Sequence, residues 1–499
     1  MYSLFKKTVF LFTFFSVVAY SLSFSVNAQE YKREGYWYYD SFNLEKLHEE
    51  GIDGSEVKIA DIDTMINPDV EWLSDANIVI REKNITPFYG DISPVTKDFE
   101  KAYHATDMLG ILQGNGRGAL SGSAQIGIAP KAVVYHYAAV TSEDDSITGG
   151  DIYDEAVRLA LEDNVDIISI PAGGLSFFDK QYPYILEALR RGIPVIAAHA
   201  NSPVRMNQTL APDTYFDSDN NRLEYDVLPT SSIKDEICYW PGMVTVQALN
   251  EAGGLQSHSN IDDPGTDICA PGDDIWMQFN DWGYFETRDG GCSTATTTVA
   301  GYLALAMDKW QNATGNQILQ LMVHTAANQT KNAAGKNDGS SVTGLIRDMY
   351  TGFGMIDVNS MLDTDPSIYP DVNPLLYIDI YREVTFAKAK NSLNELKENK
   401  NILEIAEVLD SQLQSENIER PDFLIALLGE REALDENPST NAAQSPLPEV
   451  KAPEENKETP LEKAVSDFIS SKTGIIVIFS LSAILISVVL KLFSSNRKS

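Results

Sequence analysis

The stretch Gly290-Gly291-Cys292-Ser293-Thr294-Ala295-Thr296-Thr297-Thr298-Val299-Ala300-Gly301 decides the fold. Glycines lead up to the serine, small residues follow it, and the apolar segment 302–307 comes next. This pattern predicts a loop that turns into a buried helix, with Ser293 in its first turn. Helix starts leave backbone N–H donors unpaired and favour negative charge, so a serine here suits an acyl-transfer nucleophile beside an oxyanion hole. The alternative is a glycine turn and a serine cap before a core helix.

Strand and helix patterns alternate along the rest of the chain. We expect strands over residues 57–62, 77–80, 133–139, 165–170, 193–198 and 243–248, and helices over 105–112, 151–162, 184–191, 293–310 and 316–327. This alternation is typical of an α/β fold with a doubly wound, mostly parallel sheet sandwiched by helices. Asp61 interrupts the first apolar strand. We therefore expect that strand to be unevenly buried on its two faces.

Three polar residues stand at the predicted junctions between elements, upstream of Ser293. Asp63 ends the first strand, His104 opens the helical stretch 105–112, and Asn201 follows the strand 193–198. Sites in parallel sheets lie at the carboxyl ends of the strands. An acyl-transfer site needs a nucleophile, a base, an acid that orients the base, and oxyanion donors. These four residues could supply all of them, and Asp, His and Ser follow the chain order of the subtilisin triad.

The motifs around these residues resemble the subtilase family of serine peptidases. Residues 57–64 (Val-Lys-Ile-Ala-Asp-Ile-Asp-Thr) resemble its aspartate motif, and residues 104–110 (His-Ala-Thr-Asp-Met-Leu-Gly) resemble His-Gly-Thr-His-Val-Ala-Gly. Residues 291–301 resemble Gly-Thr-Ser-Met-Ala-x-Pro-x-Val-Ala-Gly, and 197–201 resemble the oxyanion segment Ala-Ala-Ala-Gly-Asn. Residues 257–260 and 270–272 match two further landmarks of the family. The resemblance covers residues 37–362.

This resemblance implies a role for each site residue. Ser293 would attack the scissile carbonyl, and His104 would take its proton and return it to the leaving amine. Asp63 would orient the imidazole and stabilise its charged form. Asn201 and the Ser293 N–H would receive the oxyanion. The substrate would add as a strand along the edge formed by Ile170, Pro171, Ala172, Gly173 and Gly174.

Several positions depart from the family motifs. The substituted residues are Met65 for a glycine, Asp107 for the second histidine, Pro171 for a serine, Ala200 for a glycine, Cys292 for a threonine and Thr297 for a proline. Met65 requires a turn without strained backbone angles, and Pro171 removes one N–H from the substrate edge. The four catalytic positions are intact. The sequence therefore predicts an active enzyme with narrow or unusual specificity.

The composition of the chain limits which partners and cofactors we expect. A net charge of −34 argues against nucleic acid. The three cysteines allow at most one disulfide, for which we expect the pair Cys238–Cys269, and they form no zinc motif. Asp217, Asp219 and Asn221 alternate like calcium ligands but lack the distal glutamate of the full loop. We therefore expect no required cofactor, with calcium only as a possible structural ion.

The ends of the chain predict membrane attachment. Lys6 and Lys7 precede an apolar stretch and a small-residue cleavage site, so residues 1–28 are predicted as a removed signal peptide. Residues 29–56 form an N-terminal extension, 57–365 the peptidase domain, 366–436 a helix-rich spacer and 437–472 a Pro/Glu-rich linker. Residues 474–493 are predicted as a transmembrane helix and 494–499 as a cytoplasmic tail. The catalytic domain would then lie outside the cell membrane.

The predicted function is a membrane-anchored serine endopeptidase acting on proteins or peptides outside the membrane. The order of signal peptide, catalytic domain, linker and anchor resembles that of the mycosins, the anchored subtilases of type VII secretion. That likeness implies secretion-system or surface partners. Two other functions stay open, namely a catalytically silent surface binding protein with the same fold, and a peptide ligase or transpeptidase.

Overall fold

The computed structural model describes residues 33–81, 93–117, 125–139, 150–172, 182–199, 204–205, 215–216, 222–223, 226–227, 240–255, 266–280, 283–327, 345, 347 and 351–431. The predicted signal peptide, linker and transmembrane segment lie outside these residues. Within the described ranges, no helix combines the length and apolarity needed to cross a membrane.

A seven-stranded sheet forms the centre of the molecule. Its strands stand in the order β11-β10-β5-β4-β1-β3-β2, and every neighbouring pair is parallel. The strands are β1 (Lys58–Asp63), β2 (Ile78–Ile80), β3 (Val133–Ala138), β4 (Ile167–Ile170), β5 (Val195–Ala198), β10 (Val244–Leu249) and β11 (Ile268–Pro271). On one side of β1 the chain winds outward through β4, β5, β10 and β11, and on the other side β3 lies between β1 and the edge strand β2. This topology confirms the predicted parallel α/β sheet.

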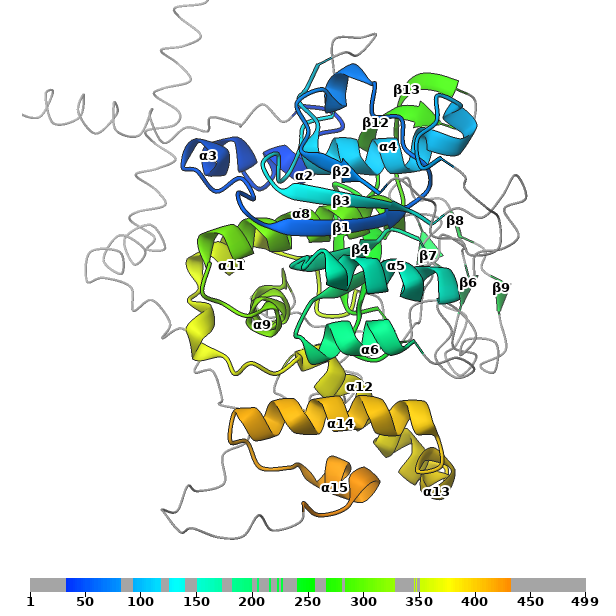
Figure 1. The fold of residues 1–499 in the computed structure, drawn as a ribbon, viewed down its shortest axis with the longest axis vertical. Helices are drawn as coiled ribbons and strands as arrows, with labels where there is room; N and C mark the ends of the chain where they lie inside the picture. Colours follow the sequence, from blue (N-terminus) through cyan, green and yellow to red (C-terminus); the bar gives the residue numbers. More distant parts are fainter. Residues whose placement is uncertain are drawn as a thin grey trace, which may run out of the picture. The chain divides into compact units, whose positions relative to one another are not determined.

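Helices cover both faces of this sheet (Figure 1). One face carries α4 (Phe99–Gln113) and α8 (Cys292–Lys309), with α9 (Gly315–Thr325), α11 (Val358–Asp363) and the short η1 (Glu71–Leu73) in the same core. The other face carries α5 (Gly150–Glu162) and α6 (Pro183–Arg190). Strand residues alternate between the two cores, since Ile59 packs in the first and Ile62 in the second.

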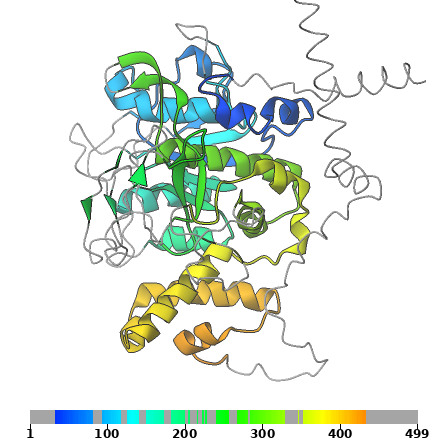
Figure 2. The same ribbon diagram turned by 180° about the vertical axis from the view of Figure 1, so that it is seen from behind.

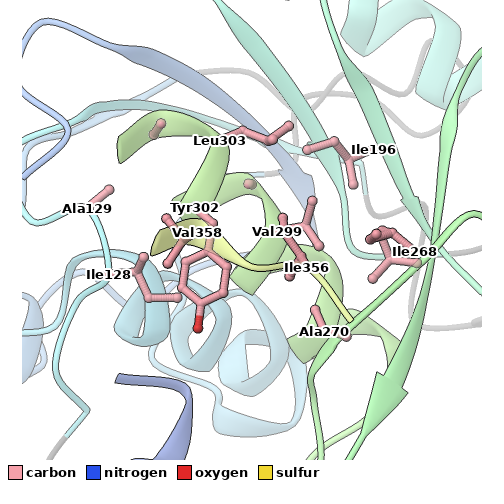
Figure 3. Close-up of a cluster of buried hydrophobic side chains, with 14 of the residues drawn as sticks. Ile128, Ala129, Ile196, Ile268, Ala270, Val299, Tyr302, Leu303, Ile356 and Val358 are labelled. Atoms are coloured by element: carbon pink, nitrogen blue, oxygen red, sulfur yellow. The ribbon is translucent and has the colours of Figure 1, made fainter. Parts of the chain in front are cut away.

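Helix α8 is buried along most of its length, as its apolar and small residues predict. Figure 3 shows Val299 and Tyr302 of this helix among side chains from β5, β11 and the loop around Ile128. A Cβ atom on Gly301 would lie 2.7 Å from Ile128 Cγ2, so only glycine permits this close approach. The helix that begins at the Ser293 loop is therefore held rigidly in the core.

Short antiparallel pairs extend the fold beyond the main sheet. The hairpin of β12 (Ile275–Asn280) and β13 (Gly283–Asp289) connects β11 to α8 and was not predicted. Two-residue strands form the parallel pair β6 (Val204–Arg205) and β9 (Asp226–Val227), and the antiparallel pair β7 (Tyr215–Phe216) and β8 (Arg222–Leu223). The hairpin matters most for the site because its second strand leads directly into the Ser293 loop.

The N-terminal extension is part of the core. It forms α2 (Trp37–Asp40) and α3 (Leu44–Glu49). Trp37 Nε1 donates a hydrogen bond to the Asp273 carbonyl (2.8 Å), and the Tyr38 hydroxyl donates to the Ile126 carbonyl (2.8 Å). The Tyr302 hydroxyl of α8 donates in turn to the Tyr38 carbonyl. These contacts join the extension to the turn before β12, to the loop at Ile126 and to α8.

The residues after 365 form η2 (Pro366–Ile368), α12 (Pro374–Ala389), α13 (Leu393–Leu396), α14 (Lys400–Ser415) and α15 (Asp422–Leu428). These helices share one hydrophobic core with α5 and α6, and Figure 2 shows them in yellow to orange against that side of the molecule. Asn373 Nδ2 donates to the Gly242 carbonyl (2.9 Å), and Gln412 Nε2 to the Leu189 carbonyl (3.1 Å). On α14, Ala406, Leu409 and Leu413 are buried and Leu403 is half-buried.

Two expectations about buried residues are wrong. Strand β1 is buried on both faces in spite of Asp61, because His136 on β3 hydrogen-bonds the Asp61 carboxylate at 2.8 Å. Cys269 is a buried thiol whose Sγ donates to the Thr351 carbonyl (3.5 Å), so the expected Cys238–Cys269 disulfide is not formed. Cys238 itself lies outside the described residues.

Candidate active site

Asp63 is the last residue of β1, at the carboxyl edge of the sheet. Its carboxylate is almost completely buried. The backbone N–H of Thr64 donates to Asp63 Oδ1 (2.5 Å), and the Thr64 hydroxyl oxygen accepts from the N–H of Ala105 in α4 (3.1 Å). The turn after the strand is therefore tied to α4, and it holds the carboxylate in one orientation.

His104 pairs with this carboxylate. Its Nδ1 atom lies 2.7 Å from Asp63 Oδ1 and 2.9 Å from Oδ2. Burial lowers the pKa of His104, but the negative charges of Asp63, Asp61 and Asp107 outweigh burial, so the pKa lies above its ordinary value. A histidine held this way keeps Nε2, on the far side of the ring, available for proton transfer.

The predicted position of His104 at a helix start is wrong. Helix α4 begins at Phe99, and the Asp98 carboxylate caps it by accepting from the Glu100 N–H (3.3 Å). His104 therefore lies in the second turn. The segment before it has no helix-breaking residue, so the apolar stretch that follows His104 marked the middle of the helix rather than its beginning.

Ser293 lies in the first turn of α8, as predicted, and its side chain is half-buried. The loop before Ser293 packs closely against the turn that follows β11. Gly290 has φ +156°, and a Cβ atom there would lie 2.0 Å from the Gly272 carbonyl oxygen. Because β11 is parallel to β1, this loop and Asp63 lie at the same carboxyl edge of the sheet.

Threonine hydroxyls satisfy the first carbonyls of α8. The Oγ1 atoms of Thr296, Thr297 and Thr298 donate to the carbonyls of Cys292 (2.7 Å), Ser293 (3.1 Å) and Thr294 (2.9 Å). At Thr297, where the family motif has proline, the helix thus gains a second donor for the Ser293 carbonyl. This departure leaves the helix start intact.

Asp107 connects the histidine helix to the hairpin that leads to Ser293. Its Oδ1 atom accepts from the backbone N–H of Gln278 on β12 (3.0 Å). Gln125 joins both partners, since its Nε2 donates to the Asp107 carbonyl (3.0 Å) and its N–H donates to Gln278 Oε1 (2.8 Å). All three side chains are buried. The residue that replaces the second histidine of the motif therefore ties two parts of the site together.

The structure describes some of the remaining predicted site residues and does not describe others. Met65 is buried without a left-handed backbone, as its turn requires. Ile170 ends β4, with Pro171 buried and Ala172 half-buried after it. Outside the described residues lie Gly173, Gly174, Ala200, Asn201, Asp217, Asp219 and Asn221. In the part of the chain that is described, no group of three or more His, Cys, Asp and Glu side chains could hold a metal ion.

Comparison with known proteins places this site in a family. Residues 54–344, more than half of the chain, match the Subtilase family. The chain is 26% identical to Subtilisin NAT of Bacillus subtilis subsp. natto over 340 residues, which cover 67% of this chain and 72% of that protein. It is 27% identical to the subtilisin of Bacillus pumilus over 287 residues, which cover 56% of this chain and 87% of that protein.

Among solved structures, MycP1 from Mycobacterium smegmatis aligns with a TM-score of 0.46 and 15% identity, covering 68% of this chain and 86% of that one. The family match spans the strand that ends in Asp63, the helix that carries His104 and the Ser293 loop. The chain therefore belongs to the subtilase family of serine peptidases.

Proposed function

We propose that this chain is a membrane-anchored serine endopeptidase that cleaves proteins or peptides outside the membrane. Asp63, His104 and Ser293 act as its catalytic triad, and the reaction passes through an acyl-enzyme. The observation that carries the proposal is the Asp63–His104 hydrogen bond at the sheet edge where the Ser293 helix begins.

The triad roles follow from the chemistry of this arrangement. The Asp63 carboxylate holds Nδ1 of His104, so Nε2 serves as the base that takes the proton of the Ser293 hydroxyl. The serine oxygen then attacks the scissile carbonyl. His104 returns the proton to the leaving amine, and a water molecule activated by the same histidine hydrolyses the acyl-enzyme.

Charge on the carbonyl oxygen is stabilised by two donors. The Ser293 N–H belongs to the first turn of α8, where backbone donors have no partner within the helix, and the helix dipole favours a negative charge there. The Asn201 side chain supplies the second donor. Loss of one such donor costs about 100- to 1000-fold in rate.

The substrate binds as an added strand along residues 170–174. Its backbone pairs with this edge, and the side chains at alternate positions determine specificity. Pro171 has no N–H, so the edge offers one donor fewer than a serine would. Because this hydrogen bond to the substrate backbone is missing, binding depends more on the contacts of the substrate side chains. This dependence favours a narrow specificity.

The proposal also includes attachment to the membrane, a partner protein and a structural ion. The uncharged run 474–490 and the signal pattern at residues 1–28 support a single-pass protein with its catalytic domain outside. The resemblance in chain organisation to mycosins supports a partner in a secretion system or at the cell surface. Catalysis needs no cofactor, and Asp217, Asp219 and Asn221 are candidates for a structural calcium ion only.

The test is a cleavage profile of the full chain on a peptide library, with Ser293→Ala as the matched control. The proposal predicts internal cleavage that the control lacks. Products joined to an added amine nucleophile in place of hydrolysis would instead identify a ligase. A folded protein that cleaves nothing and binds peptides equally well with and without Ser293 would identify a binding protein.

A further inference from the structure

A row of polar side chains crosses the buried sheet beneath the candidate triad. Asp61 of β1 stands in register with His136 of β3 on one side and with Ser169 of β4 on the other. All three residues are at most 2% exposed. Asp61 and Asp63 are two residues apart on one strand, so both project from the same face of the sheet. That face is the one covered by α4 and α8.

Asp61 and His136 form a second carboxylate–histidine pair. Asp61 Oδ2 lies 2.8 Å from His136 Nδ1. Among the residues that the structure describes, His136 Nε2 and Ser169 Oγ have no hydrogen-bond partner. Apolar side chains would fill such a layer without the desolvation cost of buried polar groups. A polar layer at this depth therefore points to a role other than stability.

We propose that Asp61 is a positioning residue for the catalytic histidine, with its carboxylate held by His136 so that its charge reinforces that of Asp63 on His104. The inference rests on the proposed triad. Asp61 is separated from Asp63 along the strand by about 7 Å, and Asp63 holds His104. The Asp61 charge therefore lies close enough to the Asp63–His104 pair to interact with it inside the protein. The imidazolium that forms when His104 takes the serine proton is stabilised by both carboxylates.

The surroundings of His104 support this effect. After burial, which lowers the pKa of His104, the charges that raise it come from Asp63, then Asp61, then Asp107. The pKa of Asp61 lies above its ordinary value, because burial raises it by more than the hydrogen bond to His136 lowers it. The elements packed around this region carry these further described titratable side chains: Glu71 on η1, Glu100, Lys101 and Tyr103 on α4, Tyr135, His136 and Tyr137 on β3, Tyr153, Asp154, Glu155, Arg158 and Glu162 on α5, Arg288 and Asp289 on β13, and Cys292, Tyr302, Asp308 and Lys309 on α8.

The first variant, Asp61→Asn, removes the charge and keeps an oxygen that accepts from His136 Nδ1. We expect the acid limb of kcat/KM to move to lower pH by about 0.5–1 unit, because loss of a negative charge lowers the pKa of the catalytic imidazole. If Asp61 had only a structural role, the acid limb of the kcat/KM profile would not move. NMR titration of His104 in a Ser293→Ala background gives the same shift without activity, so a failed triad proposal is distinguishable from a failed role for Asp61.

The control is Asp308→Asn, at the other end of α8. Asp308 Oδ2 accepts from the N–H groups of Asp53, Gly54 and Ser55, and it lies 15 residues, or about 22 Å, along the helix from Ser293. This variant should lose stability and keep the acid limb unchanged.

The double variant Asp61→Val/His136→Leu replaces the whole pair with apolar residues. Removal of both partners of a buried pair is often tolerated, so we expect a folded enzyme with the same downward shift. An unmoved His104 pKa in the two Asp61 variants would overturn the proposal. Failure of both to fold would overturn it as well, since the pair would then be a structural requirement.

Discussion

The imidazole of His104 and the carboxylate of Asp63 meet at 2.7 Å, and they differ sharply in exposure. The Asp63 side chain is 1% exposed, whereas that of His104 is 25% exposed. The carboxylate therefore lies behind the ring, and only the ring reaches the surface. This order, a buried acid behind an accessible base, fits the proposed role of His104 as the base that takes the Ser293 proton.

The first prediction concerns pH. The neutral form of His104 is the base, and its pKa lies above the ordinary 6.5 after the neighbouring carboxylates outweigh burial. We expect kcat/KM to rise with pH through a midpoint above 6.5. The same group stabilises the fold below pH 6.5, and this stability is lost as the pH rises through the raised pKa. A pH–rate profile with an acid midpoint below 6 would contradict the assignment.

The second prediction concerns Asp107. Asp107→Leu leaves the buried Gln278 N–H without the acceptor it now has, at a cost of about 1–3 kcal/mol. Asp107→Asn keeps an acceptor oxygen and should cost less. Because the bond joins the His104 helix to the hairpin before Ser293, kcat should fall more in the leucine variant. Thermal unfolding and steady-state kinetics check both, and equal losses in the two variants would argue against the link.

The third prediction concerns Gly290. A methyl group there would lie 2.0 Å from the Gly272 carbonyl oxygen, so the backbone before Ser293 must shift. A displacement of about 1 Å at a nucleophile can cost about 100-fold in rate, and we expect a loss of that order for Gly290→Ala. Gly253→Ala is the control, since Gly253 has φ +80° and nothing within 4 Å of the added atom. It should lose about 1–2 kcal/mol of stability and no activity.

The fourth prediction concerns the N-terminal extension. Trp37 is buried in the main core and bonded to Asp273, so Trp37→Ala should cost about 3–5 kcal/mol. Glu49→Ala, at an exposed position on α3, should change stability by less than about 0.5 kcal/mol. We therefore expect the active protein to retain this segment. N-terminal sequencing of the purified active protein checks this, and an active form that starts beyond Phe42 would disprove it.

The sequence predicts those features that depend on neighbouring residues. The Ser293 loop was readable because glycines, a serine and an apolar run follow one another directly. The strand ending in Asp63 was predictable because its apolar residues also lie close together in the sequence. Helix α4 was placed correctly in its interior, but its start was missed because Asp98 was not recognised as the residue that caps it.

Features that depend on distant partners could not be predicted. Asp61 was expected to leave β1 unevenly buried, because its partner His136 lies 75 residues away and meets it only through the register of β1 and β3. The role of Asp107 depends on Gln278, which lies 171 residues further along the chain. Pairings of this kind follow from the folded sheet rather than from local patterns.

The central claim is that Ser293 is a nucleophile activated by His104 and Asp63. The most direct measurement is labelling of the folded full chain with a fluorophosphonate, followed by intact mass and peptide mapping. We predict one adduct, on Ser293, that is absent in Ser293→Ala and forms far more slowly in His104→Ala. A folded wild-type protein that forms no adduct on Ser293 would contradict the claim.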